Sequence, residues 1–301
     1  MHTLQICRDH PFRLVCANLQ DAVTLGPMAT MREQRIAAEL RTLRGTRTST
    51  DVQQALGITP SKLSRIESCA VRPKPADVRQ LAEFYGAPPE TVERLVNAAQ
   101  QARKPSWWAP FIGPDWDEAL THHLELETEA ERIDSWTLDL VPGLLQVPSY
   151  IAALIGGRPD VDEDQLERRL ELRAARRARV EHGELEVWAV LSEAALHQEI
   201  GGQAVLAEQL SYLSEVPGRV TVQVVPFNAG AHAGLGSPFH VLRFSAWPTV
   251  VYQETITKGL YRDDAEVVEA HARTMDHIRA AALSAKESRE LLARRVSELE
   301  G

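Results

Sequence analysis

The chain has 301 residues, of which 44% are hydrophobic and 25% are charged, and its formal net charge is −9. This composition excludes global disorder and a collagen-like repeat, and the length predicts about two domains. Since no stretch approaches about 20 consecutive apolar residues, no membrane-spanning helix is predicted. The 3 cysteines show no C-x-x-C spacing, which argues against a disulfide framework. The first thirty residues lack a signal-peptide pattern, so we expect a cytoplasmic protein.

The negative charge is unevenly distributed along the chain. Residues 32–104 contain 13 basic and 8 acidic residues, a net charge of +5, whereas residues 105–301 contain 18 basic and 32 acidic residues, a net charge of −14. Such an asymmetry indicates different partners for the two parts. A basic module therefore precedes an acidic one.

Residues 1–30 show no clean periodicity, and we expect them to form a disordered N-terminal extension. Met28 and Met31 stand directly before the first convincing helical pattern. The alternative is therefore that translation starts further downstream. Neither interpretation gives this segment a role.

Five short helices are predicted between residues 31 and 102, with Gly or Pro between them. The first ends at Gly45, the second covers Ser49–Leu56, the third covers Pro60–Glu67, the fourth ends at Gly86, and the fifth contains Val92, Leu95 and Val96. Gly57 supplies a tight turn, Thr59 an N-cap, and Pro60 the first position of the third helix. Together the second and third helices predict a helix–turn–helix.

The third helix gives the strongest functional signal. Leu63 and Ile66 are predicted to be buried. The outward polar residues are then Ser61, Lys62, Ser64 and Arg65. Arg can bind guanine through two hydrogen bonds, and Lys and Ser can bind bases or phosphates. The pattern favours a helix that enters the major groove, with a plain helical bundle and a solvated polar face as the alternative.

The same segment resembles a known family. The resemblance rests on the run Leu56-Gly57-Ile58-Thr59-Pro60-Ser61-Lys62-Leu63-Ser64-Arg65-Ile66-Glu67, followed by Arg72-Pro73-Lys74-Pro75. The segment closely resembles the XRE (Cro-type) DNA-binding domain. The resemblance covers residues 32–100 and implies a five-helix, lambda-repressor-like domain whose third helix enters the major groove. By position it implies groove contacts for Thr59, Ser61, Lys62, Ser64 and Arg65, and backbone contacts for Arg72 and Lys74. One departure is Asp51, because the start of the second helix often carries Gln and an acid there would repel phosphate.

Residues 103–117 contain several prolines and two tryptophans, and we expect a linker that packs on a neighbouring surface. Residues 118–301 mix helical and strand periodicities. Helices are predicted over residues 118–133, 163–180, 204–213, 263–282 and 284–299, and strands over residues 185–191, 220–224, 239–244 and 250–254. The predicted fold class is therefore mainly α, with a helix–turn–helix domain at residues 31–102 and an α+β domain at residues 118–301 containing a small antiparallel sheet.

The acidic part also resembles a family. The resemblance rests on three of its segments, which are Leu140-Val141-Pro142-Gly143-Leu144-Leu145-Gln146, Glu193-Ala194-Ala195-Leu196 and Val225-Pro226-Phe227-Asn228-Ala229-Gly230-Ala231-His232. These segments are similar to the uncharacterised domain of actinobacterial antitoxin-like regulators. The resemblance implies an XRE domain in front of a regulatory domain, and a small partner protein encoded nearby. It implies no chemistry. We expect double-stranded DNA as a partner, a homodimer, and neither cofactor nor membrane.

No catalytic constellation is predicted. His122-His123 with Glu125 lacks the spacing of a helical zinc site, and neither a G-x-S-x-G nor a G-x-G-x-x-G motif is present. His232 is interpreted as a loop histidine and Glu193 as a residue that stabilises a helix start. The arginines between residues 168 and 179 predict a solvated, salt-bridged helix face, with a subunit contact as the alternative.

The leading hypothesis is a sequence-specific DNA-binding transcriptional regulator, and not an enzyme. It would bind the major groove through residues 60–67 and be regulated through residues 118–301. The alternative is an antitoxin-like protein whose main role is to bind and neutralise a small partner protein.

Overall fold

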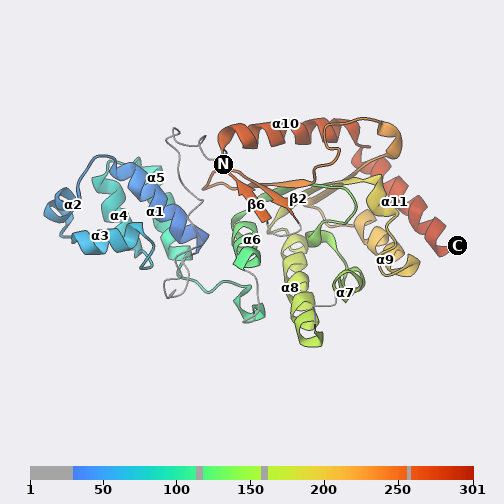
Figure 1. The fold of residues 1–301 in the computed structure, drawn as a ribbon, viewed down its shortest axis with the longest axis horizontal. Helices are drawn as coiled ribbons and strands as arrows, with labels where there is room; N and C mark the ends of the chain where they lie inside the picture. Colours follow the sequence, from blue (N-terminus) through green and yellow to red (C-terminus); the bar gives the residue numbers. More distant parts are fainter. Residues whose placement is uncertain (1–29, 113–117, 157–161, 256–258) are drawn as a thin grey trace, which may run out of the picture.

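A computed structural model of the chain describes residues 30–112, 118–156, 162–255 and 259–301. Its helical N-terminal part, residues 30–102, is here called the head, and residues 118–301, which contain the sheet, are called the body (Figure 1). The predicted N-terminal extension lies outside the described residues except for Thr30, and so do residues 113–117 of the predicted linker.

The head encloses an apolar cluster between five helices. They are α1 (Met31–Arg44), α2 (Ser49–Leu56), α3 (Pro60–Glu67), α4 (Pro75–Phe84) and α5 (Pro89–Gln101). Ile36, Leu40, Leu63, Leu81 and Leu95 are buried in this cluster. The helical pattern predicted for the head is confirmed.

The described part of the body contains a six-stranded sheet of order β3-β2-β1-β4-β5-β6. The strands are β1 (Arg132–Thr137), β2 (Glu186–Ser192), β3 (Val220–Val225), β4 (Phe239–Arg243), β5 (Val250–Glu254) and β6 (Gly259–Arg262). The first three strands are parallel, and β4, β5 and β6 are antiparallel to their neighbours. The predicted class is confirmed, but the sheet is mixed rather than antiparallel. Strands β1, β2 and β3 can run parallel because a helical crossover connects each of them to the next.

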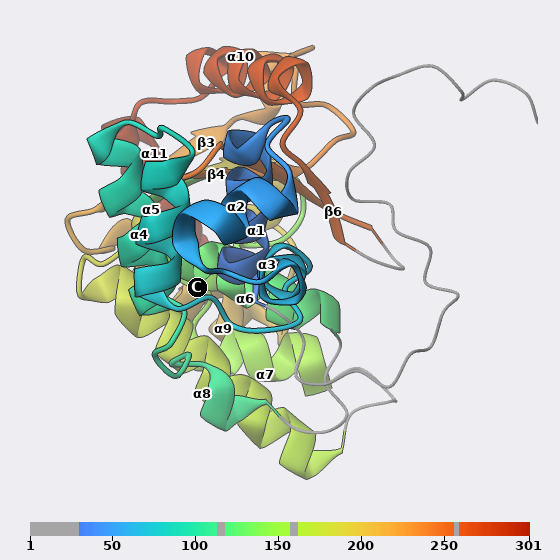
Figure 2. The same cartoon turned by 90° about the vertical axis from the view of Figure 1, so that its left-hand side faces the viewer.

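Helices cover both faces of the sheet (Figures 1 and 2). On one face lies α10 (Ala265–Ala281), and on the other lie α6 (Glu118–Glu129), α7 (Pro148–Gly156), α8 (Glu163–Glu181) and α9 (Gln203–Ser214). The last helix, α11 (Ala285–Glu300), packs on α9 and β3. The Ser288 hydroxyl accepts from the amide of Val224 at 3.0 Å, so α11 satisfies part of the edge of β3.

Strand β1 corrects the helix predicted over residues 118–133, which ends at Glu129. The strand was not predicted because its side chains are largely polar. These polar side chains form a buried ion network. Asp134 is 0% exposed, and its carboxylate accepts from Arg132 at 2.7 Å and Arg243 at 2.8 Å. Arg279 of α10 also pairs with Asp134 at 2.7 Å.

The head attaches to the body through α1 and α5. The loop between β4 and β5 inserts Trp247 into the apolar cluster of the head. Arg94 of α5 donates to the carbonyl of Ala246 at 3.2 Å and lies 5.4 Å from the centre of the Trp247 ring. An ion pair joins Arg32 of α1 to Glu129 of α6. Helices α2 and α3 therefore lie at the end of the head that faces away from the body (Figure 1).

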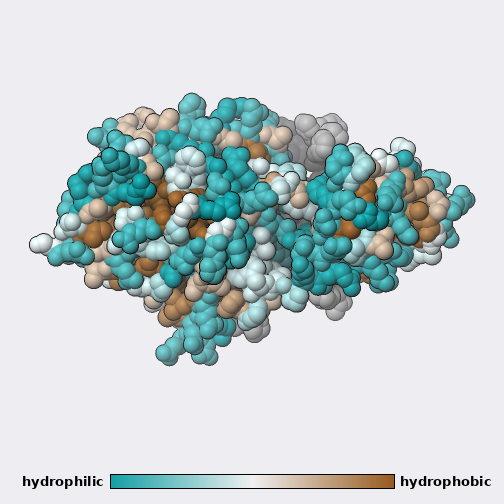
Figure 3. All heavy atoms as spheres, turned by 180° about the vertical axis from the view of Figure 1, so that it is seen from behind, coloured by the Kyte–Doolittle hydropathy of each residue, from teal (hydrophilic) through white to brown (hydrophobic). Residues whose placement is uncertain are grey.

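Hydrophilic residues cover most of the molecular face shown in Figure 3, on head and body alike. Most of the larger apolar side chains are packed in clusters inside the head, on the two faces of the sheet, and around Trp108 between α6 and α8. Phe227 and Leu235 are exposed. Among the described helices, none combines the length and the apolar character that a membrane crossing requires.

Candidate nucleic-acid interface

The turn between α2 and α3 is fixed by local chemistry. Gly57 ends α2 in the left-handed region, with φ of 69°, and its amide donates to the carbonyl of Gln53 at 2.9 Å. The Thr59 hydroxyl accepts from the amide of Lys62 at 3.3 Å, which caps α3, and Pro60 occupies the first helical position. These residues set the angle at which α3 leaves the turn.

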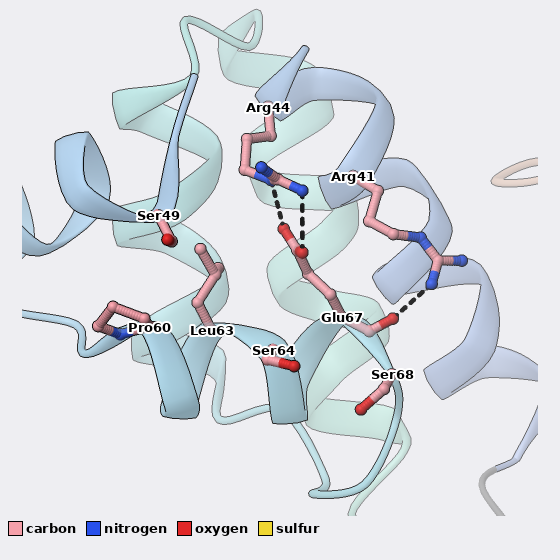
Figure 4. A pocket seen from close by; sticks show the side chains of 8 residues that line it. All are labelled: Arg41, Arg44, Ser49, Pro60, Leu63, Ser64, Glu67 and Ser68. Atoms are coloured by element: carbon pink, nitrogen blue, oxygen red, sulfur yellow. Dashed lines mark hydrogen bonds and ion pairs between the residues drawn. The ribbon is translucent and has the colours of Figure 1, made fainter. Parts of the chain in front are cut away.

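Glu67 ties α3 to α1 (Figure 4). Its carboxylate accepts two hydrogen bonds from Arg44, at 2.7 and 3.2 Å, and its carbonyl accepts one from Arg41 at 2.5 Å. Leu63 and Ile66 anchor the same side of α3 in the core. One face of the helix is thus held rigidly, and the opposite face stays free for a partner.

Every predicted site residue is exposed. This holds for Thr59, Ser61, Lys62, Ser64, Arg65, Arg72 and Lys74. A surface hollow of about 250 Å³, the basic hollow, brings four of them together, and its lining is Lys62, Arg65, Ile66, Val71, Arg72, Lys74 and Asp77. Ser64 lines a second hollow on the other flank of α3 with Arg41, Arg44 and Ser49 (Figure 4). The outward face of α3 lies between the two hollows.

Two of the predicted cations are already ion-paired. The Lys62 ammonium lies 2.7 Å from the Asp77 carboxylate, and the Arg72 guanidinium lies 2.5 Å from the Glu33 carboxylate. Arg65 differs, because its guanidinium makes no hydrogen bond or ion pair with any part of the chain that the structure describes. Of the predicted groove contacts, it is the cation that is free to bind.

Two features of the site were not predicted from the sequence. Asp51 does not stand free at the start of α2, because its carboxylate accepts from the Thr48 amide at 2.7 Å and hydroxyl at 2.8 Å in a capping box. The Thr-x-x-Asp spacing could have revealed it, and both hydrogen bonds lower the pKa of Asp51. The second feature is Ser68, which is exposed one helical turn beyond Ser64.

Comparison with known families agrees with this architecture. Residues 35–95 match the model of a helix-turn-helix domain, and residues 120–294, more than half of the chain, match that of a domain of unknown function, DUF5753. The chain belongs to the DUF5753 family. Neither a curated protein nor a solved structure matches the sequence.

The DUF5753 domain contains a row of polar and aromatic residues across four strands. Ser135, His240, Tyr252 and Tyr261 stand directly opposite one another on β1, β4, β5 and β6. The Ser135 hydroxyl and Nδ1 of His240 are 2.9 Å apart, and the rings of His240 and Tyr252 stack at 5.7 Å. Burial lowers the pKa of His240 to about 4 and raises that of Tyr252 to about 12.

An ion pair lies beside this row, between α6 and α8 of the DUF5753 domain. Arg176 binds both carboxylate oxygens of Glu127, with a closest distance of 2.5 Å. Burial alone would raise the pKa of Glu127, but Arg176 and His123 together lower it below its ordinary value. The predicted solvated face of α8 is therefore wrong at Arg176, which is buried. Arg177 pairs with Glu181 at 3.1 Å, in agreement with the predicted salt-bridged face.

The Val141–Gln146 segment of the DUF5753 domain supports a second arginine of α8. The Arg173 guanidinium donates to the side chain of Gln146 at 2.9 Å. A Cβ at Gly143 would meet this guanidinium at 2.7 Å, so a side chain there would displace the end of Arg173. Gln209 holds the segment from α9 through the Leu145 carbonyl and the Val147 amide, both at 2.8 Å. Within the described residues, no three potential ligands gather as a metal site would need.

Proposed function

We propose that the protein is a sequence-specific DNA-binding transcriptional regulator of the XRE type. The observation that supports this proposal best is the face of α3, which is clamped from behind by Leu63 and Glu67 and presents an unpaired Arg65. The match to a helix-turn-helix domain agrees with it. The five-helix order of the head is also that of the lambda-repressor-like domain to which the sequence is similar.

In this proposal α3 lies in the major groove. Arg65 donates two hydrogen bonds to a guanine, and Thr59, Ser61 and Ser64 contact neighbouring bases or phosphates. Arg72 and Lys74 lie beside the DNA backbone. As a homodimer, the protein would bind half-sites about one helical turn, roughly 34 Å, apart.

The body would regulate this binding. The position of Trp247 in the core of the head supports a regulatory link, because the loop that bears it connects two strands of the body sheet. A change in the body that moves this loop would alter how the head is held.

The proposal is tested by selecting an operator from random duplexes with the full chain, then measuring fluorescence anisotropy on the operator and on a scrambled duplex. Arg65→Ala should lose about 1–3 kcal/mol of operator binding and flatten discrimination at one base pair. Arg79→Ala, on the surface between α4 and α5, is the matched control and should retain both. If a folded Arg65→Ala variant binds like wild type, Arg65 does not contact a base. If no sequence is selected, the proposed function itself is wrong.

A further inference from the structure

The basic hollow beside α3 has one acidic residue in its lining. Four cations, Lys62, Arg65, Arg72 and Lys74, surround it, and the acid is Asp77. Such a concentration of positive charge attracts the phosphates of any DNA sequence, because phosphate contacts contribute affinity without sequence information. An ion pair that restrains one of these cations therefore affects the specificity for DNA sequence.

Asp77 restrains Lys62 from a fixed position. The Asp77 side chain is 13% exposed whereas that of Lys62 is 45% exposed, so the acid is the anchored partner of their 2.7 Å ion pair. Asp77 lies in the first turn of α4, just after Pro75, where an acidic side chain also interacts favourably with the helix dipole. The Lys62 ammonium is therefore drawn to the flank of α3 toward α4.

A second carboxylate restrains Arg72 in the same way. Glu33 is only 5% exposed and lies 2.5 Å from Arg72. Glu33 is itself fixed, because its carboxylate accepts from the Thr30 amide at 2.8 Å in the capping box of α1. Two cations beside α3 are thus neutralised by recessed acids on two other helices, and Arg65 is not.

A cation that is already in an ion pair gains less binding free energy from a phosphate than an unpaired cation does. It must exchange a carboxylate for the phosphate, and the carboxylate left behind repels the DNA backbone. Hydrogen bonds from Arg65 to a base edge involve no such exchange. The pairs therefore weaken the part of binding that rests on phosphate contacts, which is essentially all of non-specific binding, and leave base-specific binding in place.

We propose that Asp77 is a specificity-determining residue that holds Lys62 away from the phosphate backbone of non-cognate DNA. This inference rests on the proposed function, since it concerns the same DNA-binding face. Asp77 need not touch DNA; it positions Lys62. Glu33 does the same for Arg72.

The test compares the full-length wild type with Asp77→Asn on the operator and the scrambled duplex over a range of salt concentrations. Freeing Lys62 adds one phosphate contact, so at about 0.1 M salt binding to the scrambled duplex should tighten about five- to tenfold, and its salt slope should steepen by about 0.9. Operator binding should tighten less, because base contacts of α3 already fix where Lys62 lies in that complex, so the ratio of the two affinities falls. Glu93→Gln is the matched control, because it breaks the exposed 2.6 Å pair of Glu93 with Arg79 between α4 and α5 and adds the same charge away from the basic hollow.

Lys62→Ala in the Asp77→Asn background should abolish the gain. The inference is overturned if the salt slope of Asp77→Asn equals that of wild type, if Glu93→Gln changes the affinity ratio as much, or if the gain survives without Lys62. Asp77→Ser provides a second polar, uncharged replacement should Asn disturb α4, and circular dichroism verifies folding. A wild type that selects no operator would instead contradict the proposed function.

Discussion

Glu127 of α6 is buried against α8, and its charge is tolerated because Arg176 binds both of its oxygens. The desolvation penalty of such a pair is repaid only while both partners are present. His123, whose Nε2 is 3.6 Å from the carboxylate, adds a weaker contact. The pair therefore fixes how α8 packs against α6 more than it adds net stability.

Arg176→Met should destabilise the protein by about 3–5 kcal/mol, because it leaves Glu127 buried without a counter-charge. Urea denaturation measures this loss. The double variant Glu127→Met/Arg176→Met should recover most of it, since an apolar pair of similar volume needs no desolvation. A single variant within about 1 kcal/mol of wild type would show that solvent reaches the carboxylate.

Two histidines make stability depend on pH. Burial lowers the pKa of both His122 and His240 from 6.5 to about 4, so the folded protein binds their protons less readily than the unfolded chain. Stability should therefore fall as pH decreases from 6.5 toward 4, by up to about 1 kcal/mol per pH unit for each histidine. Thermal unfolding of His240→Gln should show a shallower dependence, whereas His277→Gln, which removes an exposed histidine of α10, should match wild type.

At the scale of elements, the turn before α3 depends on a single backbone conformation. Gly57 has φ of 69°, and a Cβ there would meet no atom within 4 Å. Gly57→Ala should thus cost about 1 kcal/mol through backbone strain alone, and Gly57→Asn less. The control is Gly218→Ala, also without close neighbours but outside the left-handed region. Denaturation midpoints compare the three; equal values for Gly57→Ala and the control would contradict this account.

The sequence predicts the elements of the head well because its signals are local. Gly57, Thr59 and Pro60 act within a few residues, and the apolar period of 3.6 places Leu63 and Ile66 in the core. Strand β1 was not predicted because its polar side chains form ion pairs with β4 and α10, which are remote in sequence. The ion pair of Lys62 with Asp77 spans 15 residues and depends on how α4 packs, so sequence spacing could not predict it.

At the scale of the whole molecule, Trp247 joins the head to the body. Trp247→Ala should create a cavity between α1 and α5 and destabilise the head by about 3–5 kcal/mol. The head should then unfold in a separate thermal transition, and trypsin should cleave faster after Arg103. Leu235→Ala, which shortens an exposed side chain, is the control. Unchanged cleavage in Trp247→Ala would show that the tryptophan does not hold the head.

The place of Trp247 in the chain also has a consequence during synthesis. A ribosome completes all five helices of the head long before it reaches the loop between β4 and β5. The core of the nascent head therefore remains open on the side where Trp247 will insert. In a chain that stops before this loop, α3 would belong to a head whose core lacks Trp247. A stably packed head therefore requires that the β4–β5 part of the body has been synthesised.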